Sequence, residues 1–378
     1  MADIGIGMVG YGFMGRAHVN AYRKACALLG APGAAVLSVA GRGQGVEDFA
    51  RRWSVPAVYR DWRELIRDPR VQLVDCCGPH QLHPEVVHAA LAAGKHILCE
   101  KPLALETETA GTMWRAAARA ANLVHMTSFN YRFLPAVRLA RDIVRSGALG
   151  AVREMHAAYA QQGAADPRRP AGWKWDRQRG GAGALLDLGV HALDLVRCLA
   201  GEPLRVLARQ ATFVRERPAL EDPARMVEVS VDDACAALLE LSQGALATLR
   251  VSRVAWGRKN HLAIEVHAER GSLYWDLERC NELKLCEASA GGQLGFRTML
   301  VEPDLPAGAD WWPPGHVYGW EDGFTFQMAH LLTAVAERRS VAPEGADFRD
   351  GYRAVAVAEA VAQSAMQGGA VTVSSDGV

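Results

Sequence analysis

Two titratable side chains, Asp187 and His191, lie four residues apart in a run of small and apolar residues. If this run is helical, the spacing places the carboxylate and the imidazole on one face, where the carboxylate can raise the basicity of the ring. Asp194 follows three residues later on the same side. The pattern suits proton transfer, and the structural alternative is a solvated polar stripe that includes one incidental histidine.

A second pattern lies near the N-terminus, where residues 4–9 predict a short buried strand. Gly10, Gly12 and Gly15 follow in the order GYGFMG, and a helical run then extends to Leu29. A strand, a tight turn and a helix in this order are what dinucleotide binding needs. The first glycine would make the turn, the second would admit a pyrophosphate, and the third would allow close packing of helix on strand. The phosphates would then lie against the unpaired amides that start the helix.

A third pattern follows the strand predicted over residues 95–99, which runs into Glu100-Lys101-Pro102. It puts Lys101 at the carboxyl edge of a parallel sheet, where the ligands of such sheets bind. An ammonium there can polarise a substrate oxygen or help a neighbouring base to deprotonate a hydroxyl. The alternative is an exposed lysine at a strand end. Pro102 fits a fixed turn with a cis peptide bond.

Composition narrows the classes of function. The chain has 378 residues, half of them apolar, and 42 basic residues balance 42 acidic ones. This length favours two domains, and the charge balance argues against a nucleic-acid or membrane partner. No signal segment or apolar run of membrane-spanning length is evident, so we expect a cytoplasmic protein. The eight cysteines show no metal or disulfide spacing, and His80, His83 and His88 lack a completing ligand, so we expect no metal.

The order of predicted elements indicates an α/β fold. In the first third, strands alternate with helices, which is typical of a parallel sheet covered on both faces; the strands are predicted at 35–40, 73–77, 95–99 and 123–128, and the helices at 61–67, 84–93 and 106–121. Longer alternating runs then predict an open, mainly antiparallel sheet, with strands at 205–215, 234–241, 245–254 and 262–268 and a helix over 183–199 packed on it. Loops are expected at 216–226 and 287–320. We therefore predict a Rossmann domain over 1–128 and a substrate-binding and oligomerisation α/β domain over 129–378.

Together these motifs resemble the Gfo/Idh/MocA family of sugar and cyclitol oxidoreductases, over essentially the whole chain, and most closely its levoglucosan dehydrogenase-like branch. The family resemblance rests on residues 10–15, 78–83, 93–96, 100–104, 129–132 and 187–194, and the resemblance to the branch on residues 257–260, 271–273 and 312–316. It implies hydride transfer between NAD or NADP and a secondary alcohol of a sugar, anhydrosugar, glycoside or cyclitol. It also implies a homo-oligomer built through the open sheet.

The resemblance assigns roles to individual residues. It makes Lys101, Asp187 and His191 the catalytic set. His191 is the better base because its ordinary pKa lies near neutrality; Asp187 would stabilise the imidazolium and Lys101 the developing alkoxide. The expected cofactor-binding residues are Gly10, Gly12, Phe13, Met14, Gly15, Gly41, Arg42, Pro79, His83, Glu100 and Lys101. The expected substrate-binding residues are Lys101, Tyr131, Arg132, Trp175, Asp187, His191 and His316.

Selection between NAD and NADP stays open. The second strand ends at Gly41-Arg42, without the acidic residue that usually holds the ribose of NAD. Arg42 could pair with a 2′-phosphate, which favours NADP. The levoglucosan-type branch, however, is NAD-linked without that acid. We therefore expect NAD or NADP.

Several aromatic residues are further candidates for contact with a substrate. Trp311, Trp312 and Trp320 in the 287–320 loop could cover a sugar or simply fill an interface. Trp175 lies beside an arginine pair at 177 and 179 that could bind an acidic sugar, although a solvated pair is the alternative.

Two other functions are alternatives to the dehydrogenase. The same catalytic set also suits redox-neutral glycoside cleavage through transient oxidation at C3. A regulator that binds the cofactor without catalysis is the other alternative, and the intact catalytic set argues against it.

Overall fold

The computed structural model describes residues 3–177, 183–288, 293–305 and 309–374 of the chain. The chain divides into two compact units. Unit 1 contains Met1–Leu134 and Pro303–Tyr352, and unit 2 contains Pro135–Glu302 and Arg353–Val378. Unit 1 is thus formed by two separate parts of the chain, whereas the predicted domains are two continuous parts. The predicted domain boundary after residue 128 stays a prediction.

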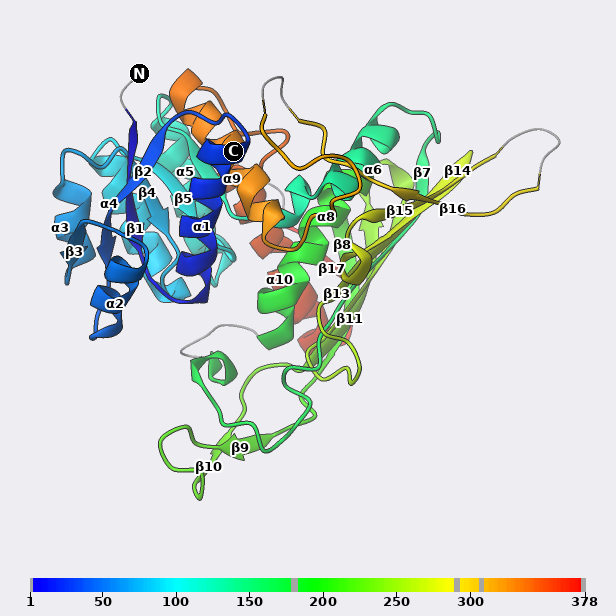
Figure 1. Cartoon of the computed structure of the whole chain (residues 1–378). Helices are drawn as coiled ribbons and strands as arrows, with labels where there is room; N and C mark the ends of the chain where they lie inside the picture. Colours follow the sequence, from blue (N-terminus) through cyan, green and yellow to red (C-terminus); the bar gives the residue numbers. More distant parts are fainter. Residues whose placement is uncertain (1–2, 178–182, 289–292, 306–308, 375–378) are drawn as a thin grey trace. The chain divides into compact units, whose positions relative to one another are not determined.

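Unit 1 is built on a six-stranded parallel sheet with the strand order β3-β2-β1-β4-β5-β6. The strands are β1 (Ile4–Val9), β2 (Ala34–Ala40), β3 (Ala57–Tyr59), β4 (Leu73–Cys76), β5 (His96–Cys99) and β6 (His125–Thr127). Its helices are α1 (Phe13–Leu28), α2 (Gly45–Arg52), α3 (Trp62–Arg67), α4 (His83–Ala92) and α5 (Thr107–Arg119) (Figure 1). This order confirms the predicted Rossmann fold, whose ligand crevice lies where the strand order reverses, between β1 and β4.

Local sequence accounts for the boundaries of these elements. Asp61 caps α3, as predicted, because its side chain accepts a hydrogen bond from the backbone N–H of Arg63. Gly94 ends the turn after α4 at a φ of +69°, a conformation that glycine adopts readily. The sequence analysis did not predict α2 or β3. Both are short, and α2 begins with glycine, so neither has a strong periodic pattern.

The later segment of unit 1 adds two helices that the sequence analysis also did not predict. Helix α9 (Asp322–Glu337) packs along α1, and α10 (Phe348–Gln367) begins in unit 1 and ends in unit 2. Just before α9, Trp320 stacks on Phe13 with the ring centroids 5.3 Å apart. Trp311 packs on Phe326 at 5.3 Å. These two tryptophans therefore contribute to packing within unit 1.

Unit 2 is built on a nine-stranded sheet with the order β16-β15-β14-β13-β7-β12-β11-β8-β17. Neighbouring strands are antiparallel except for the parallel pair β7 and β12. The strands are β7 (Val152–Ala160), β8 (Pro203–Ala211), β11 (Ala234–Leu241), β12 (Leu246–Ser252), β13 (His261–Ala268), β14 (Gly271–Asp276), β15 (Glu282–Glu287), β16 (Arg297–Leu300) and β17 (Val371–Thr372). The predicted large sheet is thus present and mixed.

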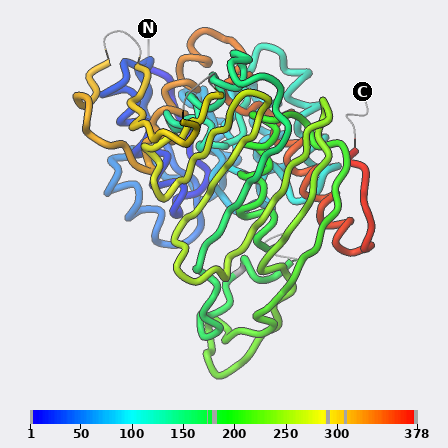
Figure 2. The backbone as a smooth tube through the Cα atoms, turned by 90° about the vertical axis from the view of Figure 1, so that its right-hand side faces the viewer, coloured from blue at the N-terminus to red at the C-terminus, as the bar shows by residue number. Residues whose placement is uncertain are grey.

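The two faces of this sheet differ. Along β11 and β12 buried and exposed residues alternate, which is the pattern of a sheet covered on one side. Helices α6 (Pro135–Arg145) and α8 (Val190–Ala200) pack behind the strands. Figure 2 views the sheet from its other face, with its strands side by side in front of these helices. Among the described residues, no helix of either unit has the length and apolar character needed to cross a membrane.

Two segments expected to be loops contain strands. Residues 216–226 lead into a small antiparallel pair, β9 (Glu216–Pro218) and β10 (Met226–Glu228), and β16 lies within residues 287–320. These expectations were wrong because proline and glycine nearby hid strands of only three or four residues. Residues 178–182, 289–292 and 306–308, which include Arg179, lie outside the described part of the chain.

The helix predicted over residues 183–199 begins differently from the expectation. Leu185–Gly189 form a π-helical turn, η4, which continues into α8. Gly183 precedes it with a φ of +43°, and a Cβ there would lie 2.2 Å from the carbonyl oxygen of Asp232. The glycine that precedes the π-helical turn therefore packs closely against Asp232. Such π turns are frequent at functional sites.

Candidate functional site

The glycine-rich turn of unit 1 has the geometry of a dinucleotide cradle. Gly10 has a φ of +108°, and a Cβ on it would lie 2.6 Å from the carbonyl oxygen of Cys77. A Cβ on Gly15 would lie 2.8 Å from the Gly10 carbonyl oxygen, so α1 packs closely on the turn. A Cβ on Gly12 would meet no described atom within 4 Å, which leaves space for a ligand against the backbone. These residues fit the pyrophosphate of a dinucleotide.

The start of α1 adds favourable electrostatics. Gly12 is the N-cap residue, and the first turn of the helix carries no acidic side chain to neutralise its positive end. Phe13 is exposed and lies on Trp320, whereas Met14 is half-buried against the core of unit 1. Of these two predicted cofactor contacts, Phe13 therefore has the more accessible side chain.

The end of β2 explains the missing acidic residue. A Cβ on Gly41 would lie 2.4 Å from the ring of Tyr11, so a larger side chain at this position would require the ring to move. The Tyr11 hydroxyl donates a hydrogen bond to the carbonyl oxygen of Arg42. Arg42 itself is exposed. Tyr11 was not singled out from the sequence, yet it shapes the turn that would face the ribose.

His83 and Pro79 lie beyond β4. His83 is the first residue of α4, one residue before the predicted start of that helix, and its side chain is fully buried. Its Nδ1 lies 3.0 Å from the carbonyl oxygen of Pro102, and its Nε2 lies 3.3 Å from that of Gly78. Burial lowers the pKa of His83. Pro79 is exposed and precedes the 3₁₀ turn His80–Leu82.

Lys101 is half-buried immediately after β5 and Glu100, and the Lys101–Pro102 peptide bond is cis. The Glu100 carboxylate accepts a hydrogen bond from the Lys101 backbone N–H at 3.0 Å. It also lies 3.0 Å from Nε2 of His18, whose Nδ1 lies 2.9 Å from Asp75. Burial raises the pKa of Glu100, but the hydrogen bond and charge of His18 outweigh it and lower the pKa to about 2. Sequence reasoning missed His18 and Asp75.

In unit 2, Asp187 and His191 lie on η4 and α8. Asp187 is half-exposed and accepts a hydrogen bond from Lys174 at 3.0 Å, whereas His191 is largely buried. The His191 ring lies 5.9 Å from the Tyr159 ring, centroid to centroid. The Tyr159 hydroxyl donates to Asn260 at 2.8 Å, as does the side-chain amide of Gln161 at 2.6 Å. His191 therefore lies beside a polar group of side chains and not in a purely apolar core.

Asp232 anchors the start of this helical segment. Its carboxylate accepts from the backbone N–H of Leu185 at 3.1 Å, and its carbonyl oxygen accepts from that of Ala184 at 3.0 Å. Burial raises the pKa of Asp232 to about 7, although the Leu185 amide acts in the opposite direction. The segment that carries Asp187 thus begins at a buried carboxyl group.

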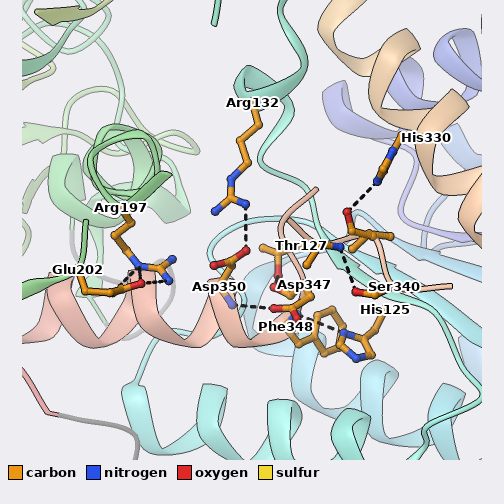
Figure 3. Close-up of polar contacts among 12 residues, drawn as sticks. His125, Thr127, Arg132, Arg197, Glu202, His330, Ser340, Asp347, Phe348 and Asp350 are labelled. Carbon is orange, nitrogen blue, oxygen red and sulfur yellow. Dashed lines mark hydrogen bonds and ion pairs between the residues drawn. The ribbon is translucent and has the colours of Figure 1, made fainter. Parts of the chain in front are cut away.

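The remaining predicted substrate contacts have different surroundings. Arg132 is buried and donates to Asp350 at 2.9 Å (Figure 3). Tyr131 is also buried, and its hydroxyl accepts from Trp320 at 3.3 Å. His316 is exposed, with Nδ1 at 2.9 Å from the Pro313 carbonyl oxygen. Trp175, in unit 2, is half-buried, and three guanidinium groups lie within 5.5 Å of its ring centroid, those of Arg169, Arg217 and Arg253.

Possible metal ligands come close together in three places among the described residues. Their ligand atoms lie within 4.8 Å of one another in the groups Cys76/His83/Cys99, His18/Asp75/Cys77 and His261/Asp276/Glu278. His83 is the one member of the predicted histidine cluster in these groups, and carbonyl oxygens already lie beside both of its ring nitrogens. The expectation that no metal binds stays a prediction.

The doubly wound sheet and the glycine cradle define a dinucleotide-binding protein of the Rossmann class. Residues 4–128 match the oxidoreductase family with an NAD-binding Rossmann fold, and residues 137–274 match the GFO/IDH/MocA C-terminal domain. The chain therefore belongs to the Gfo/Idh/MocA oxidoreductase family, as its motifs predicted.

Individual relatives are similar to this protein over almost the whole chain. Levoglucosan dehydrogenase from Pseudarthrobacter phenanthrenivorans is 35% identical over 97% of both proteins. A solved structure of levoglucosan dehydrogenase in complex with NADH and levoglucosan matches with a TM-score of 0.93, covering 99% of this chain and 100% of that one. An oxidoreductase domain protein from Kribbella flavida matches with a TM-score of 0.94 at 40% identity, with the same coverage.

Proposed function

We propose that this protein is an NAD-linked dehydrogenase that oxidises a secondary alcohol of a sugar or anhydrosugar. The observation that carries the proposal lies within unit 1. The glycine cradle follows β1, and Lys101 comes just after β5, so both lie at the carboxyl ends of strands in one parallel sheet. Ligands of such sheets bind at the carboxyl ends of the strands. The levoglucosan dehydrogenase relative supports the anhydrosugar as substrate class.

The proposed chemistry needs a base and a stabilised oxygen. Bound NAD would supply the acceptor for the hydride that leaves the carbinol carbon. His191 takes the hydroxyl proton, and Asp187 stabilises the imidazolium that results. Lys101 offers its ammonium group to the oxygen as negative charge develops there. The carbon thereby loses a hydride and the oxygen a proton, which yields a carbonyl.

The end of β2 bears on the cofactor preference. Residue 41 is a glycine with the Tyr11 ring against it, so this position brings no carboxylate to the ribose. We propose that NAD binds through the cradle, and that any use of NADP depends on the exposed guanidinium of Arg42.

A substrate panel tests the proposal. The protein is incubated with sugars, anhydrosugars, cyclitols and aryl glycosides, with NAD or NADP, while the absorbance of reduced cofactor and the release of aglycone are followed together. We expect net formation of NADH with an anhydrosugar or sugar and no release of aglycone. Release of aglycone without net NADH would replace the dehydrogenase with a redox-neutral glycosidase. Tight NADH binding without turnover of any substrate would favour a regulator.

We further propose that the protein is a homo-oligomer that associates through the open face of the nine-stranded sheet. Leu207 and Leu238 are opposite one another on β8 and β11 and are 45% and 43% exposed. Exposed apolar side chains that are neighbours on one face favour association. Sedimentation velocity should show a dimer or tetramer, and Leu238→Lys should shift the protein to smaller species. A monomeric parent protein would contradict this proposal.

A cytoplasmic location of the protein stays a prediction.

A further inference from the structure

Three buried side chains connect the cofactor helix to the strand end that carries Lys101. His18 comes from α1, Asp75 from β4, and Glu100 follows β5. The His18 and Asp75 side chains are 0% exposed, and that of Glu100 is 6% exposed. Each ring nitrogen of His18 lies within 3.0 Å of one of the two carboxylates. A histidine between two buried carboxylates is stable when both of its nitrogens donate, and therefore as the imidazolium.

The groups around His18 leave that positive charge in place. Burial lowers the pKa of His18, but the charge of Asp75 and the hydrogen bonds to both carboxylates raise it well above its usual value. Burial raises the pKa of the Cys77 thiol to about 12 and that of Tyr22 well above its usual value, so both neighbours are neutral near pH 7. The Phe324 ring of α9 lies 5.5 Å away and brings no charge.

The contacts form a path to Lys101. His18 holds one Glu100 oxygen, and the other Glu100 oxygen accepts the backbone N–H of Lys101. The Glu100 backbone N–H donates to the carbonyl oxygen of Cys76 on the neighbouring strand. The backbone where Lys101 leaves the sheet is therefore fixed from two directions, one of which depends on His18.

We propose that His18 is a positioning residue for Lys101 and acts through its hydrogen bond to the Glu100 carboxylate. The proposal rests on the proposed catalytic function of Lys101. It predicts that His18 contributes to turnover although its side chain is 0% exposed. A purely structural role would predict changes in stability alone.

The central comparison is between His18→Gln and His125→Gln, with the substrate that the panel identifies. His125 is a matched control because it also belongs to unit 1, and its Nδ1 accepts the backbone N–H of Phe348 at 3.2 Å (Figure 3). We expect His18→Gln to lower kcat by about 10- to 100-fold while the Kd for NADH changes by less than about threefold. His125→Gln should leave kcat within about twofold. A kcat of folded His18→Gln that equals the control would overturn the proposal.

A double variant tests the path through Glu100. Glu100→Gln keeps a side-chain oxygen that can accept the Lys101 N–H but removes the charge that His18 neutralises. If His18 acts through Glu100, the His18→Gln/Glu100→Gln double variant should have a kcat no lower than that of the more impaired single variant. Multiplied losses would show independent actions and overturn the proposed path.

Two further measurements separate this inference from the proposed function. In the parent protein, NMR of ¹⁵N-labelled histidines at pH 8 should show one buried ring with both nitrogens protonated, and this signal should be absent from His18→Gln. A neutral His18 at that pH would overturn the imidazolium. Lys101→Met should abolish most of kcat; if it does not, the proposed function fails first. Loss in Lys101→Met without loss in His18→Gln would overturn the positioning role alone.

Discussion

The buried polar groups at the carboxyl edge of the parallel sheet, His18 and its carboxylate partners, are closed to solvent. The polar pair formed by Asp187 on η4 and Lys174 is exposed to solvent. His18 and Asp75 form a pair with 0% exposure of either side chain. Asp187 and Lys174 form a pair in which the side chains are 35% and 47% exposed. Both contacts have similar distances, 2.9 Å and 3.0 Å. The difference lies in the solvent around them.

This difference determines what each pair can do. Removing one partner from a buried pair costs about 3–5 kcal/mol because it leaves a charge without solvent or partner. An exposed pair contributes about 0–1 kcal/mol. The buried His18 set therefore suits the fixing of a backbone, whereas the exposed contact between Asp187 and Lys174 contributes little free energy. Variants in the two regions should separate stability from turnover.

The largest effect is expected at His191. Replacing it with alanine removes the proposed base and should lower kcat by about 10²- to 10⁴-fold, with the Kd for NADH nearly unchanged. Steady-state kinetics and fluorescence titration measure the two quantities. His88→Ala, an exposed position on α4, serves as the control. Equal losses of turnover and of NADH binding in His191→Ala would instead indicate a folding defect.

The next effect concerns cofactor discrimination at Arg42. If its guanidinium pairs with a 2′-phosphate, Arg42→Ala should weaken NADP binding by about 1.5–3 kcal/mol and leave NAD binding unchanged. Isothermal titration with both cofactors decides this. Equal weakening of both would mean that Arg42 only stacks on the adenine. Tight NAD binding with no measurable NADP binding in the parent protein would remove the phosphate role altogether.

Two glycines of the cradle in unit 1 allow effects on stability and on cofactor binding to be separated. Gly10→Ala places a Cβ against the Cys77 carbonyl at a positive φ and should destabilise the protein by about 1–3 kcal/mol in chemical denaturation. Gly12→Ala meets no described atom within 4 Å and should weaken NADH binding while stability stays nearly unchanged. Similar stability losses in both variants would contradict this account of the turn.

Asp232, a buried carboxyl group of unit 2, should make stability depend on pH. Its folded pKa of about 7 lies above the usual 3.8, so between these values the folded state holds more protons than the unfolded state. Stability contributed by this group therefore falls as pH rises from 4 to 7 and is constant above that. Asp232→Asn should flatten the decrease by about 1–2 kcal/mol between pH 5 and 7 in urea unfolding. The exposed Asp222→Asn should not, and an unchanged slope in Asp232→Asn would contradict the raised pKa.

Sequence reasoning reached the parts of the site that depend on local pattern. The alternation of strands with helices and the glycine spacing of unit 1 follow from runs of apolar residues and a fixed motif, so the Rossmann fold was predictable. His18 was not, because its partners Asp75 and Glu100 are distant in sequence and meet only through the sheet register that brings β4 beside β5. Its position three residues after Gly15, one helical turn further on, was the available signal.

The π turn at Leu185–Gly189 was also beyond the sequence pattern. The spacing of Asp187 and His191 is close to one turn of either helix type, so periodicity does not distinguish them. Tertiary contacts flank this turn: Gly183 lies against Asp232, and a Cβ on Gly189 would lie 3.3 Å from the Val251 side chain of β12. The residues of the predicted catalytic set could be named from sequence, but their environments could not.

The smallest effect is expected where the comparison is sharpest, at Lys174. Lys174→Met removes one hydrogen-bond partner of Asp187 while keeping an unbranched side chain. Because this pair is exposed, the substitution should change the free energy of unfolding by less than about 1 kcal/mol. If Lys174 also restrains the Asp187 carboxylate, kcat should change by a few-fold without a change in the Kd for NADH. Raising the salt concentration in the parent protein should reproduce part of this change, since screening weakens exposed pairs. A destabilisation of 3 kcal/mol or more, on the scale of a buried pair, would show that η4 is as firmly fixed as the His18 set and would remove the contrast between the two regions.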